Sequence, residues 1–463
     1  MKKTTLLLFL LISSTLLGAE IKVGVGRKVI TPQTPMWLSG YASRTKPATE
    51  VLHDLWVKAI VFEENPESRV IIVTTDLLGL SHGVSEAVAQ RIIKKYGISR
   101  SQLLLNSSHT HSGPVVWPSL SVIFNLSSED QAVVARYSQK LTDDIVTAVD
   151  MAMSSRVPMN ISYGSGSVGF AMNRRQPTSK GVINGLNPDG PVDHDVPVIK
   201  VSTPDNKLQA VLFAYACHNT TSNTYLINGD YAGFAQIELE KSNPGVTAMF
   251  IMGCGADQNP QPRGTLELAE KYGNELAGAV QTVLAGELHM VRPPIRTDYS
   301  IIDLEFLPFN PSVYEKEIQN SDKYIQRRAQ LMLEAYNKGW NVNRFPYPIQ
   351  AVRFGKDLTI LALSGEVVVD YALWAKKNFA RENLLVAGYS NEVQCYIPTQ
   401  KILEEGGYEP ESSMIYYGLP GPFAANVQEK INKAISRVMK NTGARPSNKI
   451  SFKTQPVKKA GNI

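Results

Sequence analysis

A series of short apolar segments, each followed by a polar turn, constrains the fold of this chain more than any other feature. The segments are roughly four to eight residues long, which suits strands rather than helices. They cover residues 57–63, 70–75, 196–202, 210–215, 248–252, 358–363 and 384–387. Stretches with helical periodicity lie between them. This alternation predicts an α/β fold with a mixed β-sheet core that is flanked by helices.

The helical stretches cover residues 84–96, 131–153, 266–284 and 427–439. In the last of these, Val427, Ile431 and Ile435 lie on one apolar face, and Gly443 follows as a stop signal. A longer polar helix is predicted over 311–337. No linker rich in Pro, Ser or Gly divides the chain. We therefore expect one catalytic domain over 20–442, followed by a basic tail over 443–463.

Residues 1–19 have the pattern of a secretory signal peptide. Lys2 and Lys3 precede an apolar core, and Ala19 offers a small residue at the cleavage point. No cysteine stands there, which disfavours a lipoprotein. No later segment approaches about 18 uninterrupted apolar residues, the length that a membrane span requires. We therefore expect a periplasmic or secreted protein that is not an integral membrane protein.

Charge and cysteine content exclude two further classes of protein. The formal net charge is +5, from 47 Lys and Arg against 42 Asp and Glu. So small an excess does not indicate a nucleic-acid partner. The three cysteines, Cys217, Cys254 and Cys395, are an odd number and cannot form a complete disulfide framework. We interpret them as small buried residues that pack behind a site.

Side chains that can bind metals follow several of the predicted strands. His109 and His111 come after the apolar run 103–105, His218 after 210–215, Asp257 after 248–252, Glu366 after 358–363 and Tyr396 after 384–387. Ligands favour the carboxyl ends of strands in α/β sheets, so we expect these side chains to form one site. Two imidazoles and a carboxylate are typical of a catalytic zinc centre that keeps one position open for water.

Two other groups of polar residues have simpler interpretations. Asp193, His194 and Asp195 could form a metal triplet, but they directly precede a strand and Pro197, which favours a structural turn. Asp76 follows the strand 70–75 and could support the site from behind or cap a loop. A single buried histidine is more often a hydrogen-bonded core residue than a ligand, so only the combination of several residues indicates a metal site.

Several short motifs follow one another in an order that is specific when it is taken as a whole. The most distinctive is His109-Thr110-His111-Ser112-Gly113-Pro114. The others are Gly40-Tyr41-Ala42, His53-Asp54-Leu55-Trp56, Asp76, Asn173-Arg174, Cys217-His218, Gly229-Asp230, Gly365-Glu366, Asn391, Tyr396-Ile397-Pro398-Thr399 and Tyr408-Glu409. In order and rough spacing, the chain resembles the catalytic domain of the neutral/alkaline non-lysosomal ceramidases.

This resemblance implies a zinc (Zn²⁺) hydrolase that cleaves the N-acyl amide of a sphingolipid. It implies zinc ligands at His109, His218, Glu366 and Tyr396. It places His111, Arg174 and Tyr408 around the amide bond that is cleaved. A phenol is an unusual ligand, and Tyr396 could instead be a hydrogen-bonding neighbour of the metal. Arg174 could anchor a polar part of the substrate, or it could form a surface salt bridge beside Arg175.

The chain also departs from the family pattern. The segment 255–260 reads Gly-Ala-Asp-Gln-Asn-Pro, without the serine that has been considered a nucleophile in the family, and this disfavours an acyl-enzyme. Asp257 is then a candidate for moving the proton. The chain stops where the family's C-terminal β-sandwich domain would begin, so we expect no such domain. The partner is expected to be a small-molecule substrate, either an N-acyl lipid or an analogue that is more polar.

Two other functions stay open at this stage. A glycan-active hydrolase on the same scaffold would use Asp230, Asp257 or Glu366 as paired carboxylates, or zinc on an ester. A non-catalytic exported binding protein with a vestigial metal site would bind no metal and hydrolyse nothing.

Overall fold

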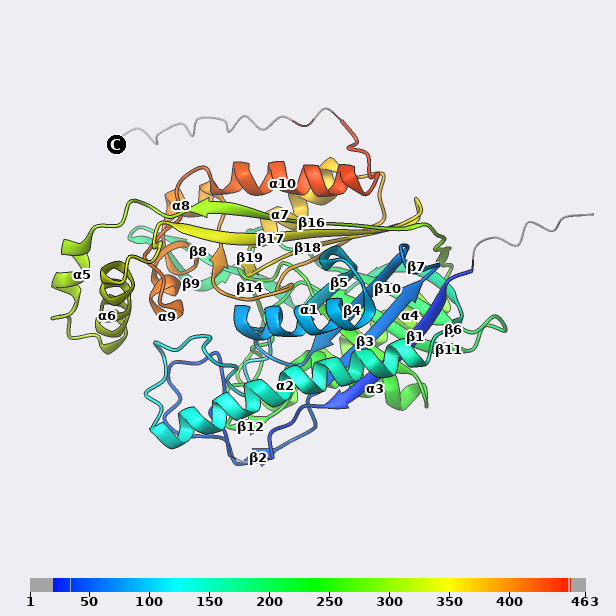
Figure 1. Ribbon diagram of the computed structural model, residues 1–463, viewed down its shortest axis with the longest axis horizontal. Helices are drawn as coiled ribbons and strands as arrows, with labels where there is room; N and C mark the ends of the chain where they lie inside the picture. Colours follow the sequence, from blue (N-terminus) through cyan, green and yellow to red (C-terminus); the bar gives the residue numbers. More distant parts are fainter. Residues whose placement is uncertain (1–19, 34, 449, 451–463) are drawn as a thin grey trace, which may run out of the picture.

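The chain folds into three sheet-and-helix layers that share one apolar core, as shown by a computed structural model that describes residues 20–33, 35–448 and 450 (Figure 1). The predicted signal peptide and most of the predicted basic tail lie outside these residues. Within the described part, no helix is both long and apolar enough to cross a membrane.

The first sheet has the strand order β5-β4-β3-β1-β6. Its strands are β1 (Lys22–Val29), β3 (Trp56–Glu63), β4 (Arg69–Thr75), β5 (Leu103–Ser107) and β6 (Val157–Pro158). Only β4 and β5 run parallel; the other pairs are antiparallel. The helices α1 (His82–Tyr96) and α2 (Ser128–Ser154) pack on its outer face.

The second sheet has the order β13-β11-β10-β7-β15. Its strands are β7 (Asn160–Ser167), β10 (Asp195–Ser202), β11 (Leu208–Tyr215), β13 (Thr247–Met252) and β15 (His289–Met290). Here β11 and β13 are the parallel pair. The helices α3 (Asp230–Ser242) and α4 (Leu266–Ala285) cover its outer face.

The third sheet has the order β16-β17-β18-β20. It consists of β16 (Ile295–Glu305), β17 (Arg344–Phe354), β18 (Leu358–Leu363) and β20 (Leu384–Ala387), with β18 and β20 parallel. The helices α7 (Val369–Asn378) and α10 (Val427–Asn441) pack on it, and Figure 1 shows α10 lying along β16 and β17.

The inner faces of the three sheets meet in the shared core. Side chains alternate along a strand, and β18 shows the consequence: Ile360 and Ala362 enter the shared core, whereas Leu361 and Leu363 pack beneath the outer helices. Because both faces of such a strand are buried, its sequence reads as a continuous apolar run. The predicted α/β class is therefore confirmed, but the described residues form three large sheets rather than one mixed sheet.

A single asparagine joins the edge strands of the three sheets. Asn106, near the end of β5, donates from Nδ2 to the carbonyl of Gly388 at 2.8 Å and accepts from the backbone N–H of Met252 at 2.8 Å. The N–H of Gly388 in turn donates to the carbonyl of Met252 at 3.1 Å. The carboxyl ends of β5, β13 and β20 are thus held side by side. The turns that carry the polar side chains of the site begin at these strand ends.

Three smaller sheets lie near these strand ends. They are β14 (Gln258–Pro260) with β8 (Ala171–Thr178) and β9 (Gly181–Asn187), β12 (Leu226–Ile227) with β2 (Glu50–Val51), and β19 (Glu366–Val367) with β21 (Tyr396–Ile397). After β21 the chain continues through α8 (Gln400–Glu405), a π-helical turn (Tyr408–Ser412) and α9 (Ser413–Tyr417).

The long polar helix predicted over 311–337 is wrong, because the segment forms two helices. They are α5 (Pro311–Glu317) and α6 (Lys323–Asn337), at the left in Figure 1. The side chain of Asp322 accepts a hydrogen bond from the backbone N–H of Tyr324 at 2.7 Å and caps the second helix. Asp and Asn side chains that bond to the local backbone compete with helix continuation, and this explains the break.

Candidate metal centre and active site

The structure brings together the four residues that were expected to bind zinc. His109 follows β5, His218 follows β11, Glu366 begins β19 and Tyr396 begins β21, where it is paired with Glu366. All four are at most 3% exposed. Glu366 Oε2 lies 3.1 Å from His109 Nε2 and 3.2 Å from His218 Nε2, and the hydroxyl of Tyr396 lies 3.2 Å from His218 Nε2.

Backbone carbonyls determine how the two imidazoles point. Nδ1 of His109 lies 2.8 Å from the carbonyl oxygen of Leu78, and Nδ1 of His218 lies 2.7 Å from that of Gly255. A carbonyl only accepts, so each Nδ1 carries the proton and each Nε2 directs a lone pair at Glu366. Burial, with the charge of Arg174 adding, lowers the pKa of His218 to about 4, so its imidazole is neutral at pH 7.

Glu366 shows why a cation fits here. Its Oε1 accepts a hydrogen bond from the hydroxyl of Tyr417, but its buried Oε2 has no hydrogen-bond partner in the described part of the chain. Burial opposes ionisation of Glu366, and positive charge at the two imidazoles, or on a metal held between them, is needed to keep its pKa well below the ordinary value. An ionised oxygen that faces two nitrogen lone pairs is unfavourable by itself. A divalent metal would bind to all three atoms, the oxygen and the two nitrogens, and remove this repulsion.

His111 lies on the same loop and also points into the cluster. Its Nε2 is 3.2 Å from Nε2 of His109, and its buried Nδ1 has no hydrogen-bond partner within the described residues. The nitrogens of His109, His111 and His218 lie within 4.8 Å of one another, so the three could also hold a metal together. Burial and the neighbouring imidazoles lower the pKa of His111 well below its ordinary value.

Gly40 makes room for His111. Its φ of +96° is unfavourable for other residues, and a Cβ there would lie 2.3 Å from Nδ1 of His111. Arg44 holds the same loop, because its guanidinium donates to the carbonyl of His111 at 2.6 Å. The Gly40-Tyr41-Ala42 motif therefore shapes one wall of the site.

Arg174 of β8 is buried in the site and does not form a surface salt bridge. Its Nε donates to Glu409 Oε1 at 2.9 Å, and its Nη2 donates to the hydroxyl of Tyr396 at 3.2 Å. Glu409 also pairs with Arg175 at 2.5 Å, so one carboxylate orients both arginines. The guanidinium of Arg174 lies 5.5 Å from the ring centres of both Tyr396 and Tyr408.

Tyr408 lies beside these groups, with its ring centre 5.3 Å from that of Tyr396. Burial, followed by the charge of Glu366, raises its pKa, so the phenol stays protonated at neutral pH and can donate a hydrogen bond. The side chain is half-buried.

Asp257 is close in sequence to the site but is engaged elsewhere. Its Oδ1 accepts from the backbone N–H of Val369 at 2.8 Å, where α7 begins, and its Oδ2 accepts from Asn173 at 3.3 Å. Burial, with repulsion from Asp370, raises its pKa to about 7. The structure gives it a positioning contact with α7 and β8, and its role in proton movement stays a prediction.

The interpretation of Asp193, His194 and Asp195 as a structural turn is confirmed, and the contacts of Asp76, for which two interpretations were open, follow from the structure. Lys376 pairs with Asp193 and Asp195 at 2.7 Å, and Nε2 of His194 lies 2.7 Å from the carbonyl oxygen of Ala171, as expected for a structural turn. Asp76 accepts from the backbone N–H of Trp56 at 2.9 Å and from Gln236 at 2.9 Å. The three cysteines are free and buried, as interpreted from their number and position.

Two tyrosines of the site were not found from the sequence. Tyr417, at the end of α9, donates to Glu366. Tyr389 adopts a φ of 48° and places its ring centre 4.3 Å from that of His109. Nothing in the sequence around Tyr417 signals this contact. For Tyr389, its place in a glycine-containing turn after a strand was the only available signal.

The fold and the cluster define an α/β protein with a buried centre suited to a divalent metal. The sequence profile of the family described as "Neutral/alkaline non-lysosomal ceramidase, N-terminal" matches residues 21–261. The chain therefore belongs to the neutral/alkaline non-lysosomal ceramidase family.

Individual relatives agree with this assignment. The neutral ceramidase of Pseudomonas aeruginosa is 24% identical over 327 residues, which make up 63% of this chain and 46% of that protein. The neutral ceramidase of Drosophila melanogaster is 25% identical over 254 residues, which make up 52% of this chain and 36% of that protein. The chain thus spans less than half the length of these curated relatives.

Solved structures show the same fold. The crystal structure of the Pseudomonas aeruginosa neutral ceramidase superposes with a TM-score of 0.69 at 20% identity, covering 91% of this chain and 74% of that one. A ceramidase complexed with C2 gives a TM-score of 0.71 at 19% identity, covering 91% of this chain and 75% of that one.

Proposed function

We propose that the protein is an exported, zinc-dependent amidase that hydrolyses the N-acyl bond of ceramide or a closely related lipid. The family assignment and the neutral ceramidases among its relatives support the reaction and the substrate class. The signal-like pattern of residues 1–19 supports action in the periplasm or outside the cell.

One observation carries the metal part of the proposal. Glu366 Oε2 is buried without a hydrogen-bond partner in the described residues, and it faces the Nε2 atoms of His109 and His218. These three donors, with the hydroxyl of Tyr396 beside them, match the nitrogen and oxygen ligands that zinc takes in catalytic sites. Zinc bound there would polarise the substrate carbonyl and lower the pKa of water.

The remaining residues have roles that follow from their contacts. His111 is neutral at pH 7, and its Nε2, which faces the cluster 3.2 Å from Nε2 of His109, can exchange a proton with the substrate. Tyr408 keeps its proton and can donate to the oxyanion that develops when the amide is attacked. Arg174, fixed by Glu409, holds the Tyr396 hydroxyl in place and can orient a polar part of the substrate.

The glycan-active alternative loses support from the contacts of its carboxylates. Asp230 accepts backbone hydrogen bonds from Thr221 and Ser222, at 3.2 and 2.9 Å, and so anchors the loop that follows His218. Asp257 anchors α7. Both carboxylates are engaged within the fold rather than paired across an open pocket.

The test of the metal centre is elemental analysis of the freshly purified protein. We expect about one zinc per chain in the wild type, and its loss in the double variant His109→Ala with His218→Ala. His289→Ala, which removes an exposed histidine, is the control and should retain the zinc. Zinc that persists in the double variant, or a wild type that binds none, would overturn the proposal and favour a non-catalytic binding protein.

A further inference from the structure

We propose that a basic groove on the third sheet is a second binding site, for a ligand that carries several phosphate groups. The groove has a volume of about 1030 Å³ and lies at the amino end of β18, whereas Glu366 follows the carboxyl end of that strand. It shares no lining residue with the metal centre in the described part of the chain. The groove is therefore a different place on the molecule from the metal centre.

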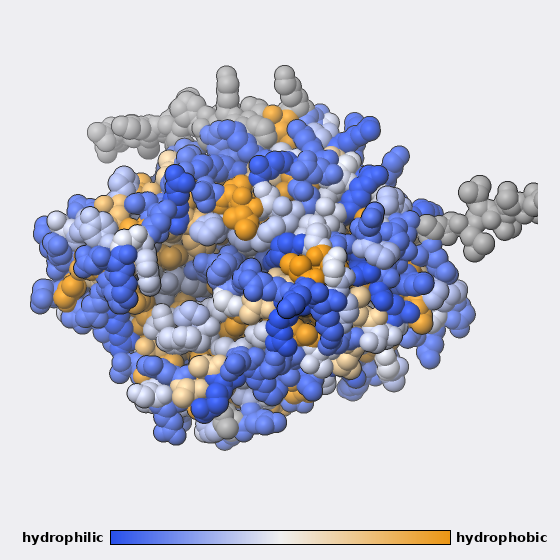
Figure 2. Space-filling view, viewed as in Figure 1, coloured by the Kyte–Doolittle hydropathy of each residue, from blue (hydrophilic) through white to orange (hydrophobic). Residues whose placement is uncertain are grey.

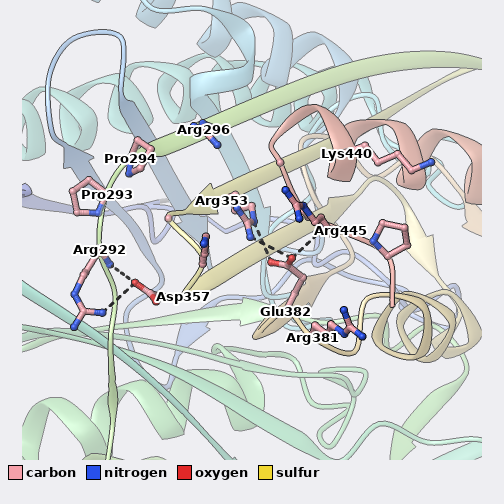
Figure 3. A pocket seen from close by; sticks show the side chains of 15 residues that line it. Arg292, Pro293, Pro294, Arg296, Arg353, Asp357, Arg381, Glu382, Lys440 and Arg445 are labelled. Carbon is pink, nitrogen blue, oxygen red and sulfur yellow. Dashed lines mark hydrogen bonds and ion pairs between the residues drawn. The ribbon is translucent and has the colours of Figure 1, made fainter. Parts of the chain in front are cut away.

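Four segments far apart in the sequence build the groove (Figure 3). They are the chain entering β16, the turn between β17 and β18, the loop after α7 and the end of α10. Among the described residues that line it, seven are cationic and two are acidic. The cationic residues are Arg292, Arg296, Arg353, Lys356, Arg381, Lys440 and Arg445. This excess equals the formal net charge of the whole chain, +5, so the groove concentrates positive charge.

Both carboxylates that line the groove already form hydrogen bonds and ion pairs within the protein. Glu382 accepts from Arg353 through Nε at 3.1 Å and Nη2 at 3.2 Å, and it also accepts from the backbone N–H of Arg445 at 3.2 Å (Figure 3). Asp357 accepts from the backbone N–H of Arg292 at 3.0 Å and lies 3.7 Å from the guanidinium of the same residue.

Five cations are left without a carboxylate in ion-pair distance, as far as the described residues reach. They are Arg296, Lys356, Arg381, Lys440 and Arg445. The undescribed residues do not change this balance, because residues 1–19, 34, 449 and 451–463 contain no Asp or Glu and add six lysines. No side-chain carboxylate of this chain neutralises these five groups.

The fold brings two cationic side chains of the groove, Arg296 and Arg353, close together beside Gly443. A Cβ at Gly443, where φ is +95°, would lie 3.1 Å from Nη1 of Arg296 and 3.6 Å from Nη1 of Arg353. The carboxyl end of α10 attracts cations, but it is equivalent to only about half a negative charge. The helix end therefore accounts for a small part of the excess, and an external anion would offset the rest.

The chemistry of the ligand follows from the type and number of the donors. Five of the seven cations are arginines, whose planar guanidinium matches phosphate oxygens through paired hydrogen bonds. A phosphate group carries up to two negative charges, so two or three such groups balance the excess. The volume lies at the upper end of small-molecule sites, which favours an extended ligand over one free phosphate.

The experiment measures binding of inorganic tripolyphosphate by calorimetry at low salt, and binding of phosphatidylglycerol vesicles against phosphatidylcholine vesicles. The test variant is Lys356→Ala with Arg381→Ala, two exposed residues outside any ion pair seen in the described residues. The control is Lys180→Ala with Arg136→Ala, which removes the same charge from exposed positions elsewhere. Thermal unfolding verifies that both variants are folded.

We expect the test variant to bind at least about tenfold more weakly and the control to bind within twofold of the wild type, since two charge-assisted contacts are lost. If tripolyphosphate binds, and binding weakens in the test variant but not in the control variant, the ligand is a soluble one. Vesicle binding with this pattern, without tripolyphosphate binding, identifies lipid headgroups. The absence of both, or an equal loss in test and control variants, would overturn the site.

Discussion

At the scale of single residues, the two histidines of the His109-Thr110-His111 motif differ in what holds them. Nδ1 of His109 is tied to a backbone carbonyl, which directs its other nitrogen to the metal position. Nδ1 of His111 has no such partner among the described residues. We therefore propose His109 as the metal ligand and His111, whose Nε2 faces the cluster 3.2 Å from Nε2 of His109, as the group that exchanges a proton with the substrate.

His111→Ala should therefore retain zinc and lose roughly 10²–10³ in kcat, the loss expected when one group that stabilises the transition state is removed. Zinc content and kcat are measured on the same preparation. The alternative is a centre formed by His109, His111 and His218, whose nitrogens are close enough to share a metal. Loss of zinc from His111→Ala would favour that three-histidine centre.

Tyr417 donates a hydrogen bond to Glu366, the proposed metal ligand, and is therefore a positioning residue. Contacts of this kind commonly change metal affinity by roughly 10–100-fold. Tyr417→Phe should weaken zinc binding by that factor in competition with a chelator, and Tyr416→Phe at the neighbouring position should not. Equal zinc affinity in Tyr417→Phe and the wild type would show that the hydrogen bond does not support the metal centre.

At the scale of elements, the site depends on the carboxyl ends of strands that belong to different sheets. The side chain of Asn106 holds the ends of β5, β13 and β20 together, and the turns that carry His109 and the Gly388–Asn391 segment leave from this point. Asp257 then attaches α7 to the same region through the backbone N–H of Val369. Each of these polar groups is buried and satisfied, so it fixes geometry more than it adds stability.

The raised pKa of Asp257 gives a prediction about pH. Its pKa is about 7 in the folded protein, above the ordinary value near 4, so the unfolded chain releases this proton first. The free energy of unfolding should then fall as the pH rises from about 4 towards 7. Asp257→Asn stays neutral and should lose less stability over that window.

Urea unfolding at pH 5 and pH 7.5 measures the effect. Asp189→Asn changes an exposed carboxyl and serves as the control. Its free energy of unfolding should depend on pH as that of the wild type does. If Asp257→Asn and the wild type lose the same stability between the two pH values, Asp257 does not titrate in this window.

At the scale of the whole molecule, the surroundings of the centre bear on the substrate. The sequence left open an N-acyl lipid or a more polar analogue, and the side chains of Asn219 and Asn228 near the centre form hydrogen bonds with the backbone. An apolar cluster adjoins the centre through Leu78, whose carbonyl accepts from Nδ1 of His109, and Tyr417 packs against this cluster. Its buried members are Met36, Leu78, Val115, Leu120, Ile123, Phe124 and Val134.

The apolar cluster leads us to expect a preference for long acyl chains. In a series of N-acylsphingosines, kcat/KM should rise with acyl length by up to roughly fourfold per methylene that becomes buried. Phe124→Leu should reduce this dependence, whereas Trp340→Ala, which removes an aromatic residue with 63% exposure, should not. Flat or falling kcat/KM across the series would favour a polar substrate.

The surface of the face seen in Figure 2 is mostly hydrophilic, with apolar residues scattered over it. The groove on the third sheet gathers seven cationic side chains against two acidic ones. The molecule thus separates two kinds of environment along β18, with the buried metal centre near its carboxyl end and the basic groove near its amino end.

The sequence by itself determined the α/β class and most strands and helices, and it pointed to the residues that the structure brings together in the candidate metal centre. Apolar periodicity indicates which side chains are buried. The residue types His, Glu and Tyr at strand ends indicate side chains that can bind a metal. Only the tertiary structure decided that the strands form three large sheets, that Asp257 serves α7, and that Tyr417 supports Glu366. Strand pairing and long-range hydrogen bonds depend on which buried surfaces meet in space, and the order of residues along the chain does not encode that directly.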